Sequence, residues 1–439
     1  MEHKPTFSER YSAIIKVMMI GVLILLLLIP SFMVQDIIRE RERNQENVKR
    51  EISSKWGQSQ TITGPIITIP YTAVRDVVDG KKRLETRHIH LLPSKLNIEG
   101  NVDTSLLSRS IYDVIAYSSQ LRISGTFDGS ELKSMSNIPA TAQWNKATIN
   151  LGLSDLTGVQ DGITMHWGDD TFDFNPGIDI RDNFNSGVSA PLAFHQDDVV
   201  EFHFDLNLKG SEDLNFIPVG KVTHVNLKSS CPNPNFYGTF LPTERDVTET
   251  GFEANWKVLH LNRNFPQAWT NSDQQVHSST FGVKLLLDVE PYQKTMRSAK
   301  YAILFIAMTF LTFFFIEILG KKKIHPIQYI LIGLVLILFY VLLLSISEQL
   351  GFNLAYFIGS FAVVLLITVY TASVLKSNKQ SLIMFTILTV LYGFIYIIIQ
   401  LAEYSLLFGS IGLFLFLAAV MIASRKVDWY NIGTKSIDR

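Results

Sequence analysis

The sequence predicts a membrane protein with six transmembrane α-helices, one near the amino terminus and five near the carboxy terminus, and a large β-rich extracytoplasmic domain between them. Charge is scarce, because 18% of the 439 residues are charged, against about 25% in a typical soluble chain. Between residues 302 and 423, apolar runs alternate with short breaks that hold the ionisable residues. Each run has about 20 residues, enough for a helix to cross a hydrocarbon core of about 30 Å.

The composition also limits the classes of partner that we expect this protein to bind. The formal net charge is −1 and no basic face or tail is present, which argues against a nucleic-acid partner. The apolar runs require a lipid bilayer. Cys231 is the single cysteine, so no intrachain disulfide can form, and the extracytoplasmic domain must be held by a hydrophobic core.

The first apolar run, 12–34, follows a short tail, 1–11, and is predicted to be an uncleaved transmembrane anchor. Its apolar core is longer than the roughly 7 to 15 residues of a signal peptide, and no small-residue cleavage site follows it. The charged stretch 35–57 has apolar residues at helical spacing and Glu-to-basic pairs four residues apart. We therefore expect the anchor helix to continue outward as a stalk.

Residues 58–298 are predicted to form the β-rich domain, as an antiparallel sandwich or a barrel-like fold. From Thr61 the hydrophobic period is two, in short runs rich in β-branched and aromatic residues and broken by Gly, Pro, Asn and Asp. Such runs are typical of strands, and Asp79-Gly80 is a hairpin signal. The clearest strand predictions are 61–74, 85–93, 120–129, 147–154, 199–210 and 221–230.

The five carboxy-terminal spans fall within 299–424 and precede a tail, 425–439. We place them at 301–318, 327–346, 354–375, 382–401 and 405–423. Lys and Arg in short loops indicate the cytoplasmic side, and here they alternate with loops that have none. The basic segments carry Lys4, Arg10 and Lys16; Lys321, Lys322 and Lys323; Lys376 and Lys379; and Arg425 and Lys426. Both termini are therefore predicted to be cytoplasmic, with 35–298 on the outer side.

The stretch "IEILGKKKIHPIQY", residues 316–329, contains two candidate functional residues, Glu317 and His325. Near the end of a span, Glu317 can snorkel or pair with a lysine, and so avoid the cost of about 2.5–3.5 kcal/mol that a charge has at the bilayer centre. His325 could transfer protons or bind a partner. The interpretation that we favour is a topology marker followed by a helix start, because Pro326 suits the first helical turn.

Three further candidates, Glu348, Gln400 and Glu403, are predicted to lie near the outer boundary of the bilayer. The last five spans have no Asp, Lys, Arg or His at mid-depth, whereas ion and proton pathways usually carry such residues. This pattern argues against a transporter. A transporter or flippase of an envelope component stays open as an alternative.

Motifs for catalysis, cofactors and metals are absent from the sequence. It has no H-E-x-x-H, G-x-S-x-G, P-loop or G-x-G-x-x-G, so we predict no enzyme, no cofactor and no metal site, although an enzyme with a dispersed periplasmic site stays open. Glu201, His203 and Asp205 are predicted to form a solvated face of a strand over an apolar core, and His88 and His90 likewise. Cys231 is predicted to be a packed thiol.

Several segments resemble the CreD family of inner-membrane proteins, which is associated with cell-envelope integrity. The run "RSAKYAILFIAMTFLTFFFIEILGKKKIHP" is similar to the family signature. "WGQSQTITGPIITIPY", "GKVTHVNLKSSCPNPNFYGTFLP" and "GFEANWKVLHLNRNFPQAW" also resemble family segments, in the expected order. Cys231 departs from the pattern, which would have Trp before the Pro.

The resemblance implies a multi-pass protein of the bacterial inner membrane with a periplasmic domain, here 35–298. It also implies a link to a two-component regulatory system, to tolerance of envelope-directed toxins and to the β-lactam response, and it supplies no catalytic residue. We therefore expect a role in envelope integrity or stress tolerance, by binding or structural support through the periplasmic domain. The expected partner is an envelope component or an envelope protein.

Overall fold

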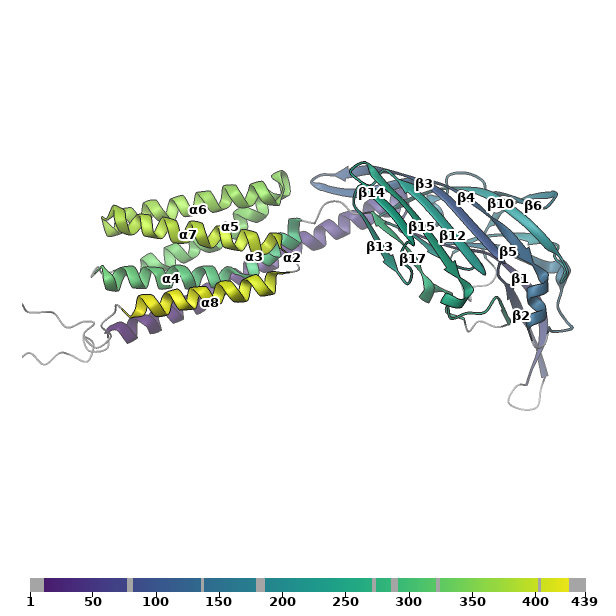
Figure 1. Cartoon of the computed structure of the whole chain (residues 1–439), viewed down its shortest axis with the longest axis horizontal. Helices are drawn as coiled ribbons and strands as arrows, with labels where there is room; N and C mark the ends of the chain where they lie inside the picture. Colours follow the sequence, from purple (N-terminus) through teal and green to yellow (C-terminus); the bar gives the residue numbers. More distant parts are fainter. Residues whose placement is uncertain are drawn as a thin grey trace, which may run out of the picture. The chain divides into compact units, whose positions relative to one another are not determined.

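The computed structural model describes residues 12–76, 82–135, 138–178, 186–270, 274–285, 291–320, 324–401 and 404–425. The chain divides into two compact units (Figure 1), a helix unit of Met1–Gln45 with Val289–Arg439 and a β-rich domain of Glu46–Asp288. Helix α2, Ser12–Trp56, contributes to both units. It is continuous through the predicted anchor and stalk and ends at Gly57, whose φ of +149° suits glycine.

The β-rich domain consists of two sheets whose inner side chains share one hydrophobic core. The nine-stranded sheet has the order β13-β17-β11-β1-β5-β9-β8, with β2 paired to β1 and β16 to β2. Its strands are β1 Gln60–Asp76, β2 Lys82–Leu91, β5 Ala147–Leu153, β8 Asn175–Pro176, β9 Gly187–Leu192, β11 Asp213–Ile217, β13 Pro234–Gly238, β16 Ala268–Thr270 and β17 Phe281–Leu285.

The eight-stranded sheet has the order β14-β15-β12-β3-β4-β10-β6-β7. Its strands are β3 Lys95–Arg109, β4 Tyr112–Asp128, β6 Thr164–Trp167, β7 Asp170–Asp173, β10 Val199–Ser211, β12 Val222–Ser229, β14 Glu244–Thr248 and β15 Gly251–Leu259. Short 3₁₀ helices connect some of the strands: η1 Gly129–Ser134, η2 Trp144–Lys146, η3 Leu156–Gly158, η4 His260–Asn262 and η5 Val276–Ser279.

The alternation in β10 matches its prediction. Phe202, Phe204 and Leu206 are buried, and the intervening Glu201, His203 and Asp205 are exposed. Cys231 is also buried, within the apolar core. The pairing differs from a purely antiparallel fold, because β1 runs parallel to β11 and β3 runs parallel to β12. A period of two is the same in both orientations, so the sequence pattern could not distinguish them.

The prediction that His90 lies on a solvated face is wrong. His90 and its neighbour Ile89 are both 0% exposed, because both faces of β2 are covered here. His90 Nδ1 lies 3.3 Å from Thr68 Oγ1 on β1, and the ring packs 5.2 Å from that of Trp269. Burial, with a smaller contribution from His88, lowers the pKa of His90 from 6.5 to about 4.

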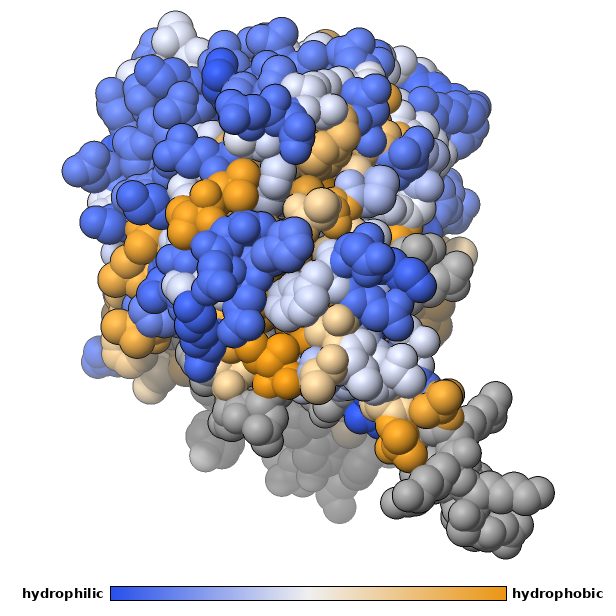
Figure 2. Space-filling model, turned by 90° about the vertical axis from the view of Figure 1, so that its right-hand side faces the viewer, coloured by the Kyte–Doolittle hydropathy of each residue, from blue (hydrophilic) through white to orange (hydrophobic). Residues whose placement is uncertain are grey.

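A two-stranded arm, residues 73–76 of β1 and 82–85 of β2, projects from the nine-stranded sheet (Figure 1). Among the described residues, β1 pairs with β2 alone beyond Thr72, while the predicted Asp79-Gly80 turn lies outside them. Val74 and Leu84 face each other across the arm and are 59% and 71% exposed. Figure 2 shows apolar side chains on this arm and in several patches on the adjoining face of the domain.

The helix unit contains the predicted apolar spans. Besides α2, its helices are α3 Pro291–Lys300, α4 Ala302–Leu319, α5 Pro326–Leu350, α6 Phe352–Leu375, α7 Asn378–Gln400 and α8 Ser405–Ser424. Of the described helices, four are long and apolar enough to cross a membrane, and α3 with α4 makes a fifth as a pair bent by 42°. Helix α8 has 20 residues, and its apolar part within the described residues, Leu407–Ile422, forms a shorter apolar helix than the other spans.

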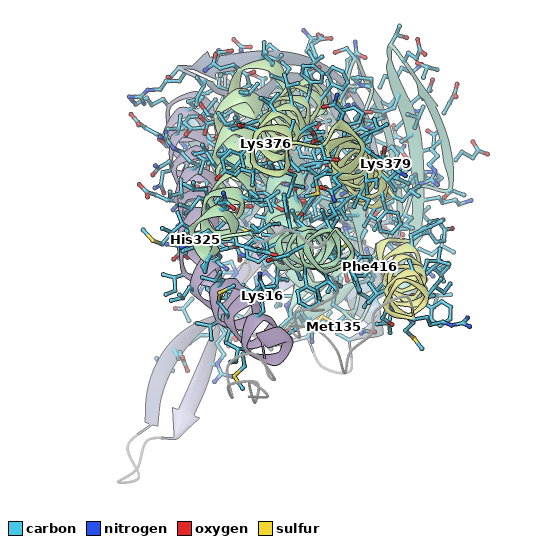
Figure 3. All side chains as sticks on the ribbon, turned by 90° about the vertical axis from the view of Figure 1, so that its left-hand side faces the viewer. Lys16, Met135, His325, Lys376, Lys379 and Phe416 are labelled. Atoms are coloured by element: carbon cyan, nitrogen blue, oxygen red, sulfur yellow. The ribbon has the colours of Figure 1, made fainter. Side chains whose placement is uncertain are left out.

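Basic residues gather at one end of the helix unit. Lys16 on α2 pairs with Glu317 near the end of α4, and α5 begins close to that pair. Because α6 returns antiparallel to α5, Lys376 and Lys379 lie at this same end. Figure 3 labels both residues, with His325 and Lys16, in a view from the left-hand side of Figure 1. Lys321, Lys322 and Lys323 lie outside the described residues.

Candidate functional site

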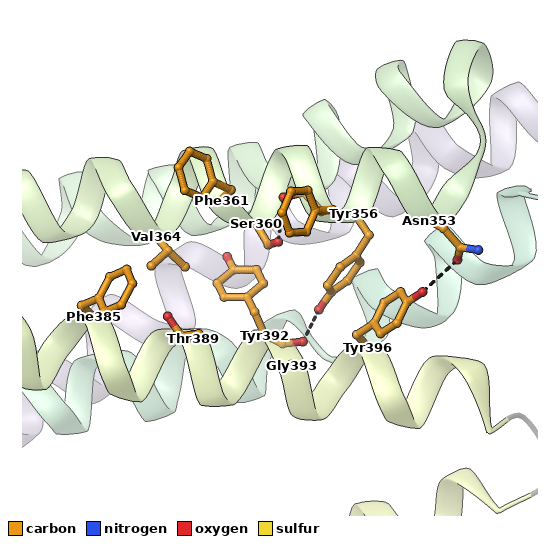
Figure 4. A pocket seen from close by; sticks show the side chains of 11 residues that line it. Asn353, Tyr356, Ser360, Phe361, Val364, Phe385, Thr389, Tyr392, Gly393 and Tyr396 are labelled. Atoms are coloured by element: carbon orange, nitrogen blue, oxygen red, sulfur yellow. Dashed lines mark hydrogen bonds between the residues drawn. The ribbon is translucent and has the colours of Figure 1, made fainter.

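A groove of about 430 Å³ lies between α6 and α7. Most of its lining is aromatic (Figure 4): Tyr356, Phe357, Phe361, Phe385, Tyr392 and Tyr396. Phe357 and Phe361 are 69% and 60% exposed, whereas Tyr356 and Tyr392 are each 3% exposed. The groove therefore has a buried tyrosine floor and a rim that faces the surroundings of the helices.

The floor is fixed by hydrogen bonds and ring packing. The Tyr356 hydroxyl donates to the main-chain carbonyl of Tyr392 at 2.8 Å (Figure 4). Behind these rings, Phe339 of α5 packs edge-on against both tyrosines. The hydroxyl of Tyr392 is buried without a hydrogen-bond partner among the described residues. An orphaned buried hydroxyl costs about 1–3 kcal/mol.

One end of the groove is polar. Gln400 donates from Nε2 to Asn353 Oδ1 at 2.7 Å and to the Tyr396 hydroxyl at 2.9 Å. Its Oε1 lies 3.5 Å from the Lys294 amine on α3. Lys294 also lies 5.8 Å from the centre of the Phe352 ring. This cluster, here called the polar mouth, joins α3, α6 and α7 at the end of the unit opposite Lys376.

The predicted site residues divide between this region and the opposite end. Gln400 belongs to the polar mouth, although it does not line the groove itself. Glu348, at the end of α5, accepts a hydrogen bond of 2.9 Å from the Tyr292 hydroxyl and so connects α5 to α3. Glu403 lies outside the described residues. Glu348 and Gln400 thus take part in helix-to-helix contacts near the polar mouth.

Glu317 is the hub of a second polar cluster. Its side chain is 5% exposed and pairs with Lys16 of α2. Its carboxylate also accepts from the Ile324 main-chain N–H at 2.9 Å and from the Tyr329 hydroxyl at 3.2 Å. One carboxylate therefore connects α2, α4, the following loop and α5, which is an arrangement suited to holding the helices together.

His325 caps helix α5. Its Nδ1 accepts from the Ile327 main-chain N–H at 3.3 Å, while Gln328 reaches back to the His325 N–H at 3.0 Å. Pro326 follows at the first helical position, where its missing N–H has no cost. The side chain thus has a local structural contact of the kind expected of a helix start.

Sequence reasoning missed the groove and Lys294. Tyrosines at 392 and 396 are spaced to share a helix face, and Asn353 lies one turn from Tyr356, so a weak signal was present. In the β-rich domain and the helix unit alike, the described residues hold no group of three or more His, Cys, Asp or Glu side chains placed to bind a metal.

These features define an integral membrane protein in which apolar helices accompany a large β-rich domain. The chain belongs to the CreD family, because the family model described as inner membrane protein CreD matches residues 12–430. It is similar to the inner membrane protein CreD of Escherichia coli (strain K12), with 32% identity over 414 residues, which cover 93% of this chain and 91% of that protein. The family resemblance of the sequence segments is confirmed.

Proposed function

We propose that this inner-membrane protein contributes to cell-envelope integrity by binding an envelope component through its β-rich domain, without catalysis. The projecting arm is the observation that carries the proposal. An exposed valine–leucine pair on a ribbon whose outer edges pair with no other described strand offers both apolar contact and available backbone groups, and both are used in strand-addition binding. The rest of the domain has its own core and supplies a rigid base.

The proposed topology has six spans, both termini in the cytoplasm and residues 35–298 in the periplasm. The clustering of Lys16, Lys376 and Lys379 at one end of the helix unit supports it, since short cytoplasmic loops are enriched in basic residues. An odd number of crossings after the domain would return the chain to the side of the first tail. Helix α8 is the proposed sixth span.

A membrane-impermeant maleimide tests this topology. Cys231 is 2% exposed, so the native thiol is expected to stay unlabelled in the folded protein. Thr250→Cys, at an exposed turn of the β-rich domain, is expected to label in spheroplasts. Lys379→Cys, at the start of α7, is expected to label only after lysis. The reverse pattern would contradict the topology.

The binding role is tested on the arm. The double variant Val74→Ser with Leu84→Ser is expected to fold normally, because exposed substitutions usually change stability by less than about 0.5 kcal/mol. In a strain that lacks the native gene, it is expected to restore detergent and β-lactam tolerance at least tenfold less well than the wild type. Survival is counted at equal protein levels.

The matched control is Val247→Ser with Leu261→Ser, which removes a valine and a leucine that are 47% and 79% exposed elsewhere on the domain. This variant is expected to restore tolerance fully. Equal tolerance in the two double variants would show that the arm is not the binding surface.

A further inference from the structure

We propose that the groove between α6 and α7 binds one acyl chain of an anionic phospholipid, with the lipid phosphate beside Lys294. This site is additional to the envelope-binding role of the β-rich domain and does not depend on it. It is a binding site, and no transport step is assigned to it.

The length of the groove matches one leaflet. On α6 the lining extends from Asn353 to Val364, and on α7 from Tyr396 back to Phe385. Each stretch advances 11 residues, about 16 Å at 1.5 Å per residue. This is close to half of a hydrocarbon core of about 30 Å. The groove therefore extends from the polar mouth to about the middle of the bilayer.

The polarity of the lining also changes along the groove in the same order as that of a lipid, from a polar headgroup to an apolar acyl chain. At the polar mouth are the amides of Asn353 and Gln400 and the hydroxyl of Tyr396. Deeper in, Phe361, Val364 and Phe385 present hydrocarbon. The exposed faces of Phe357 and Phe361 border the opening, so an acyl chain can enter sideways from the bilayer.

The charge of the polar mouth selects the headgroup. Lys294 contacts a neutral amide and an aromatic ring, and within the described ranges it forms no ion pair with a carboxylate. The carboxylate of Glu348 accepts a hydrogen bond from the Tyr292 hydroxyl. A phosphate is the natural partner of such a cation at a membrane surface. A headgroup with its own ammonium would bring a second cation close to Lys294, and the two like charges repel, so a headgroup with a net negative charge is favoured.

The volume is consistent with this occupant. Small-molecule sites usually have volumes of about 300–1,000 Å³, and this open groove has a volume of about 430 Å³.

Native mass spectrometry of the full-length protein in dodecyl maltoside tests the proposal. The probes are phosphatidylglycerol and phosphatidylcholine with identical acyl chains, added at equal concentration. The wild type is expected to retain phosphatidylglycerol at least fivefold more than phosphatidylcholine. Equal retention of the two lipids would overturn the headgroup assignment.

Two pairs of variants locate the site. Gly393→Leu places a side chain in the groove, and its Cβ meets nothing within 4 Å. Gly409→Leu on α8 is the matched control, with the same open surroundings. Lys294→Gln removes the cation, and Lys300→Gln removes an exposed one from the same helix.

Gly393→Leu is expected to lower phosphatidylglycerol retention at least fivefold, and Lys294→Gln to lower it to the phosphatidylcholine level. Both controls are expected to retain the lipid as the wild type does. Ser360→Leu, which enters the groove from α6, replaces Gly393→Leu if that variant does not fold. Retention that is unchanged in the groove-filling variant would overturn the proposal.

Discussion

Glu317→Ala is expected to lower the stability of the helix unit by about 2–5 kcal/mol, because it leaves two buried donors, the Ile324 N–H and the Tyr329 hydroxyl, without this acceptor at about 1–3 kcal/mol each and removes a partly buried ion pair. Three donors from three segments converge on this carboxylate, and the side chain is 5% exposed. The substitution leaves the Lys16 charge and the Ile324 N–H without this acceptor. The measurement is the temperature at which half of the purified protein survives heating, read by size-exclusion chromatography.

A double-mutant cycle separates charge from hydrogen bonding. Glu317→Gln keeps an acceptor for Ile324 but cannot neutralise Lys16, so adding Lys16→Met is expected to recover part of the lost stability. Glu253→Ala serves as the control, because Glu253 pairs with Lys228 on the surface, where solvent screens the attraction. It is expected to leave unfolding unchanged.

Two outcomes would contradict this account of Glu317. A wild-type unfolding temperature for Glu317→Ala would show that the cluster does not hold the helices. A stable, correctly inserted Glu317→Ala variant that loses envelope tolerance would instead assign the carboxylate a chemical role.

Acid is expected to destabilise the β-rich domain through His90. The folded-state pKa of His90 is about 4 and its ordinary value is 6.5. Between these values the unfolded chain binds a proton that the folded domain excludes, so stability falls as the pH falls. The slope is about 1.4 kcal/mol per pH unit, or about 3 kcal/mol over the whole window. Above pH 6.5 the contribution is fully present.

Tryptophan fluorescence of the intact protein measures this effect. The described tryptophans all lie in the β-rich domain: Trp56, Trp144, Trp167, Trp256 and Trp269. Denaturant unfolding at pH 7 and pH 4.5 is expected to show the loss in the wild type and a much smaller loss in His90→Gln. His166→Gln, at an exposed position on β6, is the control and is expected to keep the loss. Equal losses in all three proteins would show that other groups control the acid sensitivity.

The sequence predicted what depends on local pattern. Apolar length predicted the helices, and a period of two predicted strands in six segments that lie in β1, β2, β4, β5, β10 and β12. His325 with Pro326 was correctly interpreted as a helix start, since capping depends on neighbouring residues.

Features that depend on distant residues were not predictable. The lysine that pairs with Glu317 is 301 positions away, whereas the nearby lysines 321–323 were the natural candidates. His90 lies in the same alternating sequence pattern as an exposed residue would. It is buried only because both faces of β2 are covered at this point. The groove arises where α6 meets α7, and each helix alone is simply a span with a few tyrosines.

The separation between Lys16 and Glu317 also has a consequence during synthesis. At roughly 5–20 residues per second, a ribosome needs on the order of 15–60 s to pass from the first to the second. The ion pair between Lys16 on α2 and Glu317 on α4 can therefore form only after the described strands of the β-rich domain have been translated. The β-rich domain must be synthesised before this contact between helices can form. A chain whose translation stalls within the domain cannot pair Lys16 with Glu317.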